Sequence, residues 1–131
     1  MRKIVLLLPV ILLLFYGCAT IPKQADLKES LRSKAEEYWK LRFQDKYKET
    51  YRMEDAANLP SFDEYRATAM LIRKFKIESH SIDTIKVEGD KGIVTVRVRV
   101  SKPPIPEPVK DVFFDEWIFK DGKWQHILRL N

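Results

Sequence analysis

The spacing of hydrophobic residues divides the chain into a helical first half and a strand-rich second half. Over 26–55, apolar and aromatic side chains recur at steps of three and four residues, which predicts one long amphipathic helix. The segment 58–60, Asn-Leu-Pro, ends that helix because proline disrupts a helix interior. Ser61 and Glu64 then have the spacing of a capping box, and a shorter helix is predicted over 62–74.

From Ile77 onward the hydrophobic period changes to two, which is typical of half-buried strands. Valines at every second position over 94–100 alternate with threonine and arginine. The residues Gly-Asp-Lys-Gly at 89–92 predict a turn, so this strand should pair with the preceding one as an antiparallel hairpin. Four prolines within 102–108 predict a loop, because proline cannot donate to a sheet ladder. The alternative use of this loop is as a polyproline ligand.

The last predicted hairpin places several candidate functional residues on one face. Strands are predicted over 109–119 and 124–130, and a turn over 121–122 joins them. A two-residue Asp-Gly turn pairs Phe119 with Trp124 and Trp117 with His126. In this register Asp115 is the diagonal neighbour of His126 on the aromatic face. A slip of one residue would exchange the two faces of one strand.

The N-terminal residues form a separate segment with the pattern of an export signal. Arg2 and Lys3 precede an uninterrupted apolar run over 4–16, which is short for a bilayer core of about 30 Å. Gly17 and Cys18 follow, and a Gly-Cys pair at the end of such a run resembles the lipobox of bacterial lipoproteins. The resemblance implies cleavage between Gly17 and Cys18 and lipid attached to Cys18. The alternative is an ordinary signal peptide or anchor helix with an incidental cysteine.

This resemblance sets the expected domain boundaries and the expected location. Residues 1–17 would be a lipoprotein signal peptide, 18–25 a lipidated tether, and 26–131 the folded domain. The residue after the cysteine is Ala19 rather than aspartate, which by resemblance to lipoprotein sorting favours the outer membrane. We therefore expect a protein of the bacterial cell envelope that faces the periplasm and is bound to membrane lipid through Cys18.

Composition and charge exclude several other classes of protein. The chain has 131 residues, a formal net charge of +5 and one cysteine, so we expect one domain without an internal disulfide or a four-cysteine zinc site. Loss of the signal peptide would lower the charge to +3, which argues against a nucleic-acid partner. Two histidines far apart in the sequence, and four glycines without a phosphate-binding motif, predict neither a metal nor a cofactor.

The order of elements and the closing motif resemble the nuclear-transport-factor-2-like superfamily. A long helix, a short helix and about four antiparallel strands end in Asp-Glu-Trp-Ile-Phe-Lys-Asp-Gly-Lys-Trp over 115–124, a hairpin type that recurs in this superfamily. The resemblance covers about residues 26–131. It implies an α+β cone, in which a curved antiparallel sheet wraps around the long N-terminal helix. A cystatin-like sheet packed on one helix is the alternative fold.

Two classes of function are compatible with such a cone, because the superfamily contains isomerases, dehydratases and cyclases as well as non-catalytic binding domains. We expect a non-catalytic domain that binds a small apolar ligand or docks a partner envelope protein. Trp39, Tyr47, Trp117 and Trp124 are the candidate lining of a ligand pocket. A homodimer through the exposed face of the sheet is a further option.

Asp115 and His126 carry the alternative, catalytic interpretation. A carboxylate that orients an imidazole in an apolar pocket is a suitable general base, and a small isomerase-like or dehydratase-like enzyme would use this pair inside the cone. The non-catalytic interpretation treats the pair as a structural hydrogen bond or places it at the rim of the sheet. A filled cone would favour docking, whereas an open cavity with both side chains pointing inward would favour a ligand or catalysis.

Overall fold

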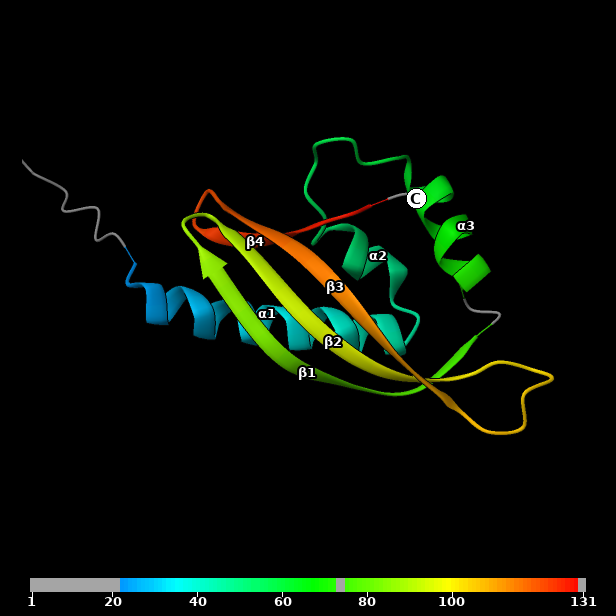
Figure 1. Cartoon of the computed structure of the whole chain (residues 1–131). Coiled ribbons are helices and arrows are strands. Elements are labelled where there is room, and N and C mark those ends of the chain that lie inside the picture. The colour runs from blue at the N-terminus through cyan, green and yellow to red at the C-terminus, as the bar shows by residue number, and fades with distance from the viewer. Residues whose placement is uncertain (1–21, 73–74, 130–131) are drawn as a thin grey trace, which may run out of the picture.

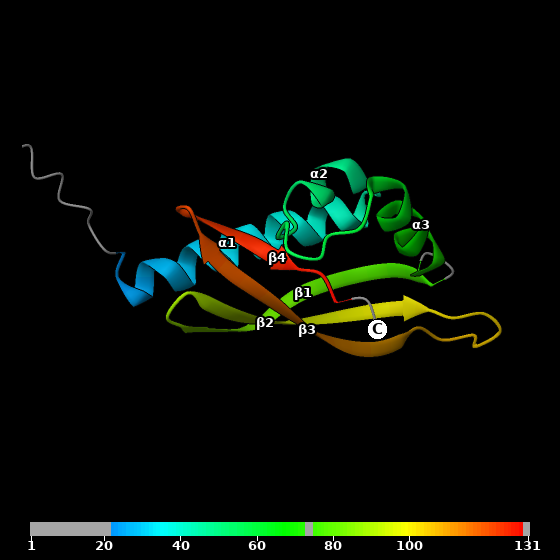
Figure 2. The same cartoon turned by 90° about the horizontal axis from the view of Figure 1, so that it is seen from above.

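The computed structural model describes residues 22–72 and 75–129 and shows helices packed on one side of a sheet (Figure 1). The helices are α1 (Gln24–Phe43), α2 (Tyr47–Tyr51) and α3 (Phe62–Ile72), and the strands are β1 (Lys76–Glu88), β2 (Lys91–Ser101), β3 (Val109–Lys120) and β4 (Lys123–Ile127). The strands form one antiparallel sheet in the order β1-β2-β3-β4. The sheet curves around α1 (Figure 2), which confirms the predicted α+β fold class.

The concave face of the sheet packs against α1 to form the core. The alternate valines of β2 over 94–100 are all buried, as their period of two predicts. Side chains from α1, β3 and β4 complete this cluster, among them Leu31, Ala35, Tyr38, Trp117 and Trp124. A side chain on Gly92 would collide with Leu31 of α1, so glycine permits the close approach of β2 to the helix.

The single long helix predicted over 26–55 is wrong, because the helix is interrupted after Phe43. Asp45 has a left-handed backbone with φ of 57°. The Lys46 N–H donates to the Leu41 carbonyl at 2.9 Å, and the Asp45 N–H donates to the Arg42 carbonyl at 3.2 Å, which is the pattern of a Schellman motif. Aspartate tolerates this conformation better than most residues with a side chain, and α2 leaves the line of α1 as a result (Figure 2).

The last hairpin has the register that the sequence predicts. Trp117 is opposite His126, and Phe119 is opposite Trp124. The strand β4 ends at Ile127, earlier than the predicted boundary. The Asp-Gly turn therefore determines which residues of β3 and β4 point into the cone.

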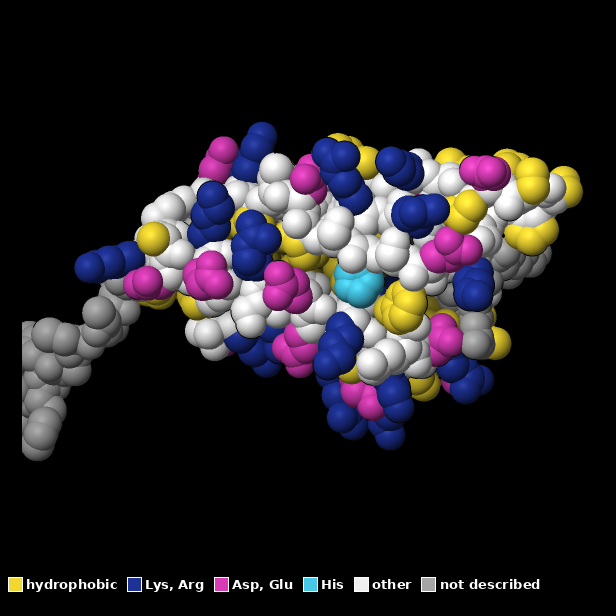
Figure 3. Space-filling model, turned by 90° about the horizontal axis from the view of Figure 1, so that it is seen from below, with side chains coloured by type: hydrophobic (Ala, Val, Ile, Leu, Met, Phe, Trp, Pro, Cys, Tyr) yellow, Lys and Arg dark blue, Asp and Glu magenta, His cyan; other side chains and the backbone are white. Residues whose placement is uncertain are grey.

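The two ends of the domain bring different elements together. The start of α1 and the turns of both hairpins lie at one end, whereas α3, the end of α1 and the loop over 102–108 lie at the other (Figure 1). On the face shown in Figure 3, hydrophobic side chains gather at this second end, and acidic and basic side chains are mixed elsewhere. The predicted tether precedes α1, so it would join the domain at the end remote from α3.

The predictions on residues 1–17, and on Gly17 and Cys18 in particular, lie outside the described residues. The predicted tether over 18–25 is described from residue 22, and its last two residues belong to α1. In the described ranges, no helix has the length and hydropathy needed to cross a membrane. Lipid anchoring through Cys18 stays a prediction.

Candidate functional site

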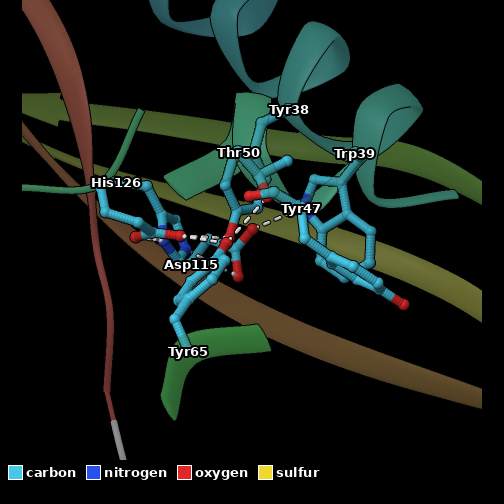
Figure 4. A network of polar contacts seen from close by, with 8 residues as sticks. Tyr38, Trp39, Tyr47, Thr50, Tyr65, Asp115 and His126 are labelled. Atoms are coloured by element: carbon cyan, nitrogen blue, oxygen red, sulfur yellow. Dashed lines mark hydrogen bonds and ion pairs between the residues drawn. The ribbon is translucent and has the colours of Figure 1, made fainter. Parts of the chain in front are cut away.

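A histidine held between two carboxylates lies on the concave face of the sheet (Figure 4). Nδ1 of His126, on β4, lies 2.6 Å from Oε2 of Glu54. Its Nε2 lies 3.7 Å from Oδ1 of Asp115, on β3. His126 and Glu54 are both buried, with 7% and 4% of their surface exposed. The structure therefore brings together the predicted pair of Asp115 and His126, and it adds Glu54 as a third charged group.

Backbone hydrogen bonds hold Glu54 against β4. The Asp55 N–H donates to the carbonyl of His126 at 2.7 Å, and the His126 N–H donates to the carbonyl of Met53 at 2.8 Å. Residues 53–55 therefore lie beside β4 as a short parallel bridge. This pairing fixes Glu54 next to the imidazole, although the two residues are far apart in the sequence.

Hydroxyl groups from α1 and α3 complete the surroundings of Glu54. The Tyr38 hydroxyl donates to Oε1 of Glu54 at 2.7 Å. The Tyr65 hydroxyl lies 3.0 Å from the same oxygen and 2.9 Å from Oγ1 of Thr50. Burial raises the pKa of both tyrosines, so their hydroxyls keep their protons at neutral pH. Both carboxylate oxygens of Glu54 therefore have donors.

Asp115 also has a partner at each oxygen. The indole N–H of Trp39, on α1, donates to Oδ2 of Asp115 at 2.5 Å, while Oδ1 faces His126. The ring of Phe113 stacks on Trp39 with 5.8 Å between the ring centroids. Glu54, His126 and Asp115, together with Tyr38, Tyr65, Thr50 and Trp39, are called the histidine cluster below.

The charge of His126 follows from its two carboxylate neighbours. Burial alone would lower the pKa of His126, but the interactions with Asp115 and Glu54 outweigh it and raise the pKa to about 9. At neutral pH both ring nitrogens carry protons, so the ring has no lone pair with which to act as a base. Among the described residues, no group of three or more His, Cys, Asp and Glu side chains is arranged to hold a metal ion.

The four residues predicted to line a pocket are divided between the core and the surface. Trp117 is fully buried and Trp124 is 3% exposed. Trp39 is also buried, and it belongs to the histidine cluster. Of the four, Tyr47 lines a surface cleft, which is described next. A role of these side chains in ligand binding stays a prediction.

A cleft of about 440 Å³ opens at the end of the domain where α1 stops, between α1, α3 and the start of β1. Its lining includes Arg42, Phe43, Tyr47, Ala69, Lys76 and Ile77. The left-handed Asp45, also in the lining, ends α1 at this point, so the helix break helps to form the cleft. The volume lies in the range of about 300–1,000 Å³ that is typical of small-molecule sites. These residues are called the Arg42 cleft below.

Arg42 connects the cleft with the histidine cluster. Its guanidinium lies over the Tyr38 ring, 5.9 Å from the centroid. Burial lowers the pKa of Arg42, but the interactions with Tyr38, Tyr65 and Glu54 outweigh it, so the net pKa is raised and the group stays charged. Within the described part of the chain, Arg42 forms no ion pair with a carboxylate.

Three residues of these sites, Glu54, Arg42 and Tyr65, carry no recognisable motif in the sequence. Arg42 follows Tyr38 by four residues, so helical spacing could have placed it beside the core stripe. Tyr65 lies on the apolar face of the predicted second helix, which is a similar signal. Glu54 has no local signal, because an acidic residue near a predicted helix end is ordinarily solvated.

Known proteins resemble this chain in structure. No protein-family model matches the sequence, and no curated protein matches it. A crystal structure from Campylobacter jejuni, described as an NTF2-like transpeptidase, shares 15% identity at a TM-score of 0.56, with 74% of this chain and 96% of that chain covered. A SEC-C motif-containing protein from Rhodopseudomonas palustris shares 13% identity at a TM-score of 0.55, with 69% of each chain covered.

At this level of identity the likeness concerns the fold alone. It agrees with the observed architecture, in which the helices pack against a curved antiparallel sheet of four strands. The chain therefore has an NTF2-like (nuclear-transport-factor-2-like) fold.

Proposed function

We propose that the chain is an envelope lipoprotein, anchored to the outer membrane through Cys18, and that its domain binds a small, largely apolar ligand without reacting with it. The Arg42 cleft carries the ligand-binding part of this proposal, because its volume suits a small molecule. Phe43, Tyr47 and Ile77 supply apolar and aromatic walls. Burial of apolar ligand surface against such walls is favourable by roughly 25 cal/mol per Å².

The histidine cluster supports a non-catalytic role. Glu54 and Asp115 face the two ring nitrogens of His126, and the Trp39 indole occupies the remaining oxygen of Asp115. A substrate would have to displace one of these buried partners before His126 could exchange a proton with it. Breaking such a buried pair costs about 3–5 kcal/mol, so the cluster is better suited to holding the fold than to proton transfer.

The position of the cleft is consistent with a lipid anchor at the other end. The segment from Cys18 to the start of α1 at Gln24 can span roughly 20 Å, so the start of α1 would stay near the bilayer. Arg42 and Phe43 lie at the far end of this helix of 20 residues, about 30 Å away along its axis. The cleft would then open away from the membrane, toward ligands of the periplasm.

The anchor is tested by labelling cells with radioactive palmitate and separating their membranes. The full chain should carry the label and co-purify with the outer membrane, whereas Cys18→Ser should lose the label and run as the longer precursor. An unlabelled wild-type chain, or a labelled Cys18→Ser variant, would contradict the lipoprotein assignment.

Ligand binding is tested with octanol as a neutral apolar probe and the lipidated full chain in phosphatidylcholine nanodiscs. Saturation-transfer NMR, corrected with empty nanodiscs, should show octanol bound to the wild-type protein. Phe43→Ser removes one wall of the cleft and should weaken this binding. Phe114→Ser is the matched control, because Phe114 is 71% exposed and is absent from the cleft lining. Absence of binding of both octanol and its carboxylate analogue, octanoate, to the wild type would overturn the proposed function.

The outer face of the sheet favours a second candidate function, the association of two copies of this chain. Ile93, Val112 and Phe114 expose 44%, 42% and 71% of their surface on neighbouring strands. Exposed apolar side chains that adjoin one another are typical of interaction surfaces. Sedimentation of the full chain in nanodiscs holding one or two copies tests this, because Phe114→Ser should lower the share of double occupancy. An unchanged share would contradict the homodimer.

A further inference from the structure

The Arg42 cleft combines apolar walls with an excess of positive charge. Among the described residues of its lining, Arg42 and Lys76 contribute two cations, and Asp45 contributes one acid, whose Oδ1 accepts a hydrogen bond from the Tyr47 hydroxyl at 2.7 Å. The remaining walls come from residues such as Phe43, Ala69 and Ile77. A wholly apolar ligand would leave the charge of this site without a complement.

Arg42 is held in place by aromatic groups and has no carboxylate partner among the described residues. It lies over the Tyr38 ring and interacts with Tyr65. Glu54, the nearby acid that acts on its charge, already faces donors from Tyr38, Tyr65 and His126. The guanidinium can offer several N–H donors in a planar fork, which suits a carboxylate better than the neutral groups around it.

The buried charges of the described chain differ from half-buried Arg42, because each of them has an oppositely charged partner. His126 lies between Glu54 and Asp115, and buried Asp55 pairs with Lys120 at 3.4 Å. Burial of a charged group without an opposite charge is costly, so native structures usually pair it. At Arg42 the missing partner would have to come from outside the described protein, and the cleft is the open side from which it can approach.

We propose that the ligand of the Arg42 cleft is an amphiphilic monocarboxylate, whose acid group pairs with Arg42 and whose apolar tail lies along Phe43 and Ile77. This inference rests on the proposed function, because it assigns a chemical class to the ligand of the same cleft. The acid is a free molecule rather than a lipid of the anchoring bilayer, since the cleft lies at the end of α1 remote from the tether.

The test compares octanoate with octanol, two probes that share one tail and differ in the head group. The lipidated full chain in phosphatidylcholine nanodiscs, corrected with empty nanodiscs, should bind octanoate at least about tenfold more tightly than octanol, because a charge-assisted hydrogen bond contributes about 1.5–3 kcal/mol. Octanol bound as tightly as octanoate would overturn the inference and leave the proposed function standing. Binding of neither probe would overturn both.

Arginine variants test whether Arg42 is the group that binds the carboxylate of the ligand. Arg42→Gln should weaken octanoate binding about tenfold and leave octanol within about twofold, whereas Arg66→Gln, an exposed site on α3, should change neither. Arg42→Lys keeps the charge without the planar fork and should give an intermediate loss. Circular dichroism tests whether each variant is folded. If a variant does not fold, the comparison of the two probes on the wild-type protein still tests the inference. Undiminished octanoate binding by folded Arg42→Gln would contradict the assignment.

Discussion

Tyr38 connects the histidine cluster, to which it belongs, with Arg42 of the Arg42 cleft, yet the charged groups of the two sites differ in their partners. In the histidine cluster, one imidazolium lies between two carboxylates, and the tyrosine and indole donors complete their contacts. In the Arg42 cleft, the guanidinium lies over the Tyr38 ring and interacts with Tyr65 and Glu54, but it forms no ion pair with a carboxylate among the described residues. The first arrangement is closed, and the second is open on one side.

This difference indicates that the histidine cluster stabilises the fold, whereas the Arg42 cleft is suited to binding a ligand. A buried charge with complete partners holds segments together, and exchanging a partner is costly. A charge at the wall of a cleft, without an opposite charge, can be paired by a ligand at little cost to the protein. We therefore expect changes in the histidine cluster to affect stability, and changes in the Arg42 cleft to affect ligand binding.

The largest effect is expected from the core that supports the histidine cluster. Trp117→Ala should lower the free energy of unfolding by about 3–5 kcal/mol, because a fully buried aromatic ring is lost and a cavity remains. Phe114→Ala, on the opposite face of the same strand, should stay within about 0.5 kcal/mol. Urea denaturation measures both values. Equal losses for the two variants would show that the concave face is not the packed side.

Glu54→Gln should lower the free energy of unfolding by about 3 kcal/mol, because the variant leaves the buried His126 cation with one carboxylate fewer. Glu107→Gln, in the exposed loop between β2 and β3, is the control and should be nearly neutral. Thermal and urea unfolding of both variants gives the comparison. A loss below about 1 kcal/mol for Glu54→Gln would mean that the histidine cluster does not stabilise the domain.

The free energy of unfolding should also change with pH, by no more than it changes in Glu54→Gln. The pKa of His126 is raised from 6.5 to about 9 on folding, so its stabilising contribution is complete below pH 6.5 and is lost as the pH rises through 9. The free energy of unfolding should fall by roughly 3 kcal/mol over this window, at 1.36 kcal/mol per pKa unit. Urea denaturation at each pH and NMR titration of His126 test this together. A flat or rising profile would contradict the charged imidazole.

The smallest effect on stability is expected at the open site. Arg42→Gln removes a cation from the face of Tyr38 and should lower the free energy of unfolding by about 1 kcal/mol, since no ion pair with a described residue is lost. The same variant should lower the free energy of octanoate binding by more than it lowers the free energy of unfolding. If Arg42→Gln lowered the free energy of unfolding by more than about 3 kcal/mol in the absence of ligand, Arg42 would be a residue that stabilises the fold rather than one that binds a ligand.

Features that depend on neighbouring residues could be predicted from the sequence. The alternation of valines in β2 predicts its buried face, and the Asp-Gly turn predicts the register that brings Asp115 close to His126. The break after Phe43 could not be predicted in this way. Glycine or proline usually marks such a break, and here Asp45 adopts the left-handed conformation without either signal.

The composition of the histidine cluster shows the other limit of local reasoning. Glu54 reaches His126 because residues 53–55 pair with β4, a contact between segments more than 70 residues apart. The tyrosines that donate to Glu54 come from α1 and α3, which no sequence spacing relates to each other. Periodicity indicates that such residues face the core, but it does not indicate which of them meet.

The sequence alone predicts the α+β class and the pairing of the last two strands correctly, because each depends on residues a few positions apart. Only the folded domain shows that the predicted catalytic pair lies in a closed cluster with Glu54, and that a cleft opens beside Arg42. The physical reason is that burial and pairing of charges depend on which segments fold against one another. A side chain such as Glu54 has the same local sequence whether it is solvated or buried.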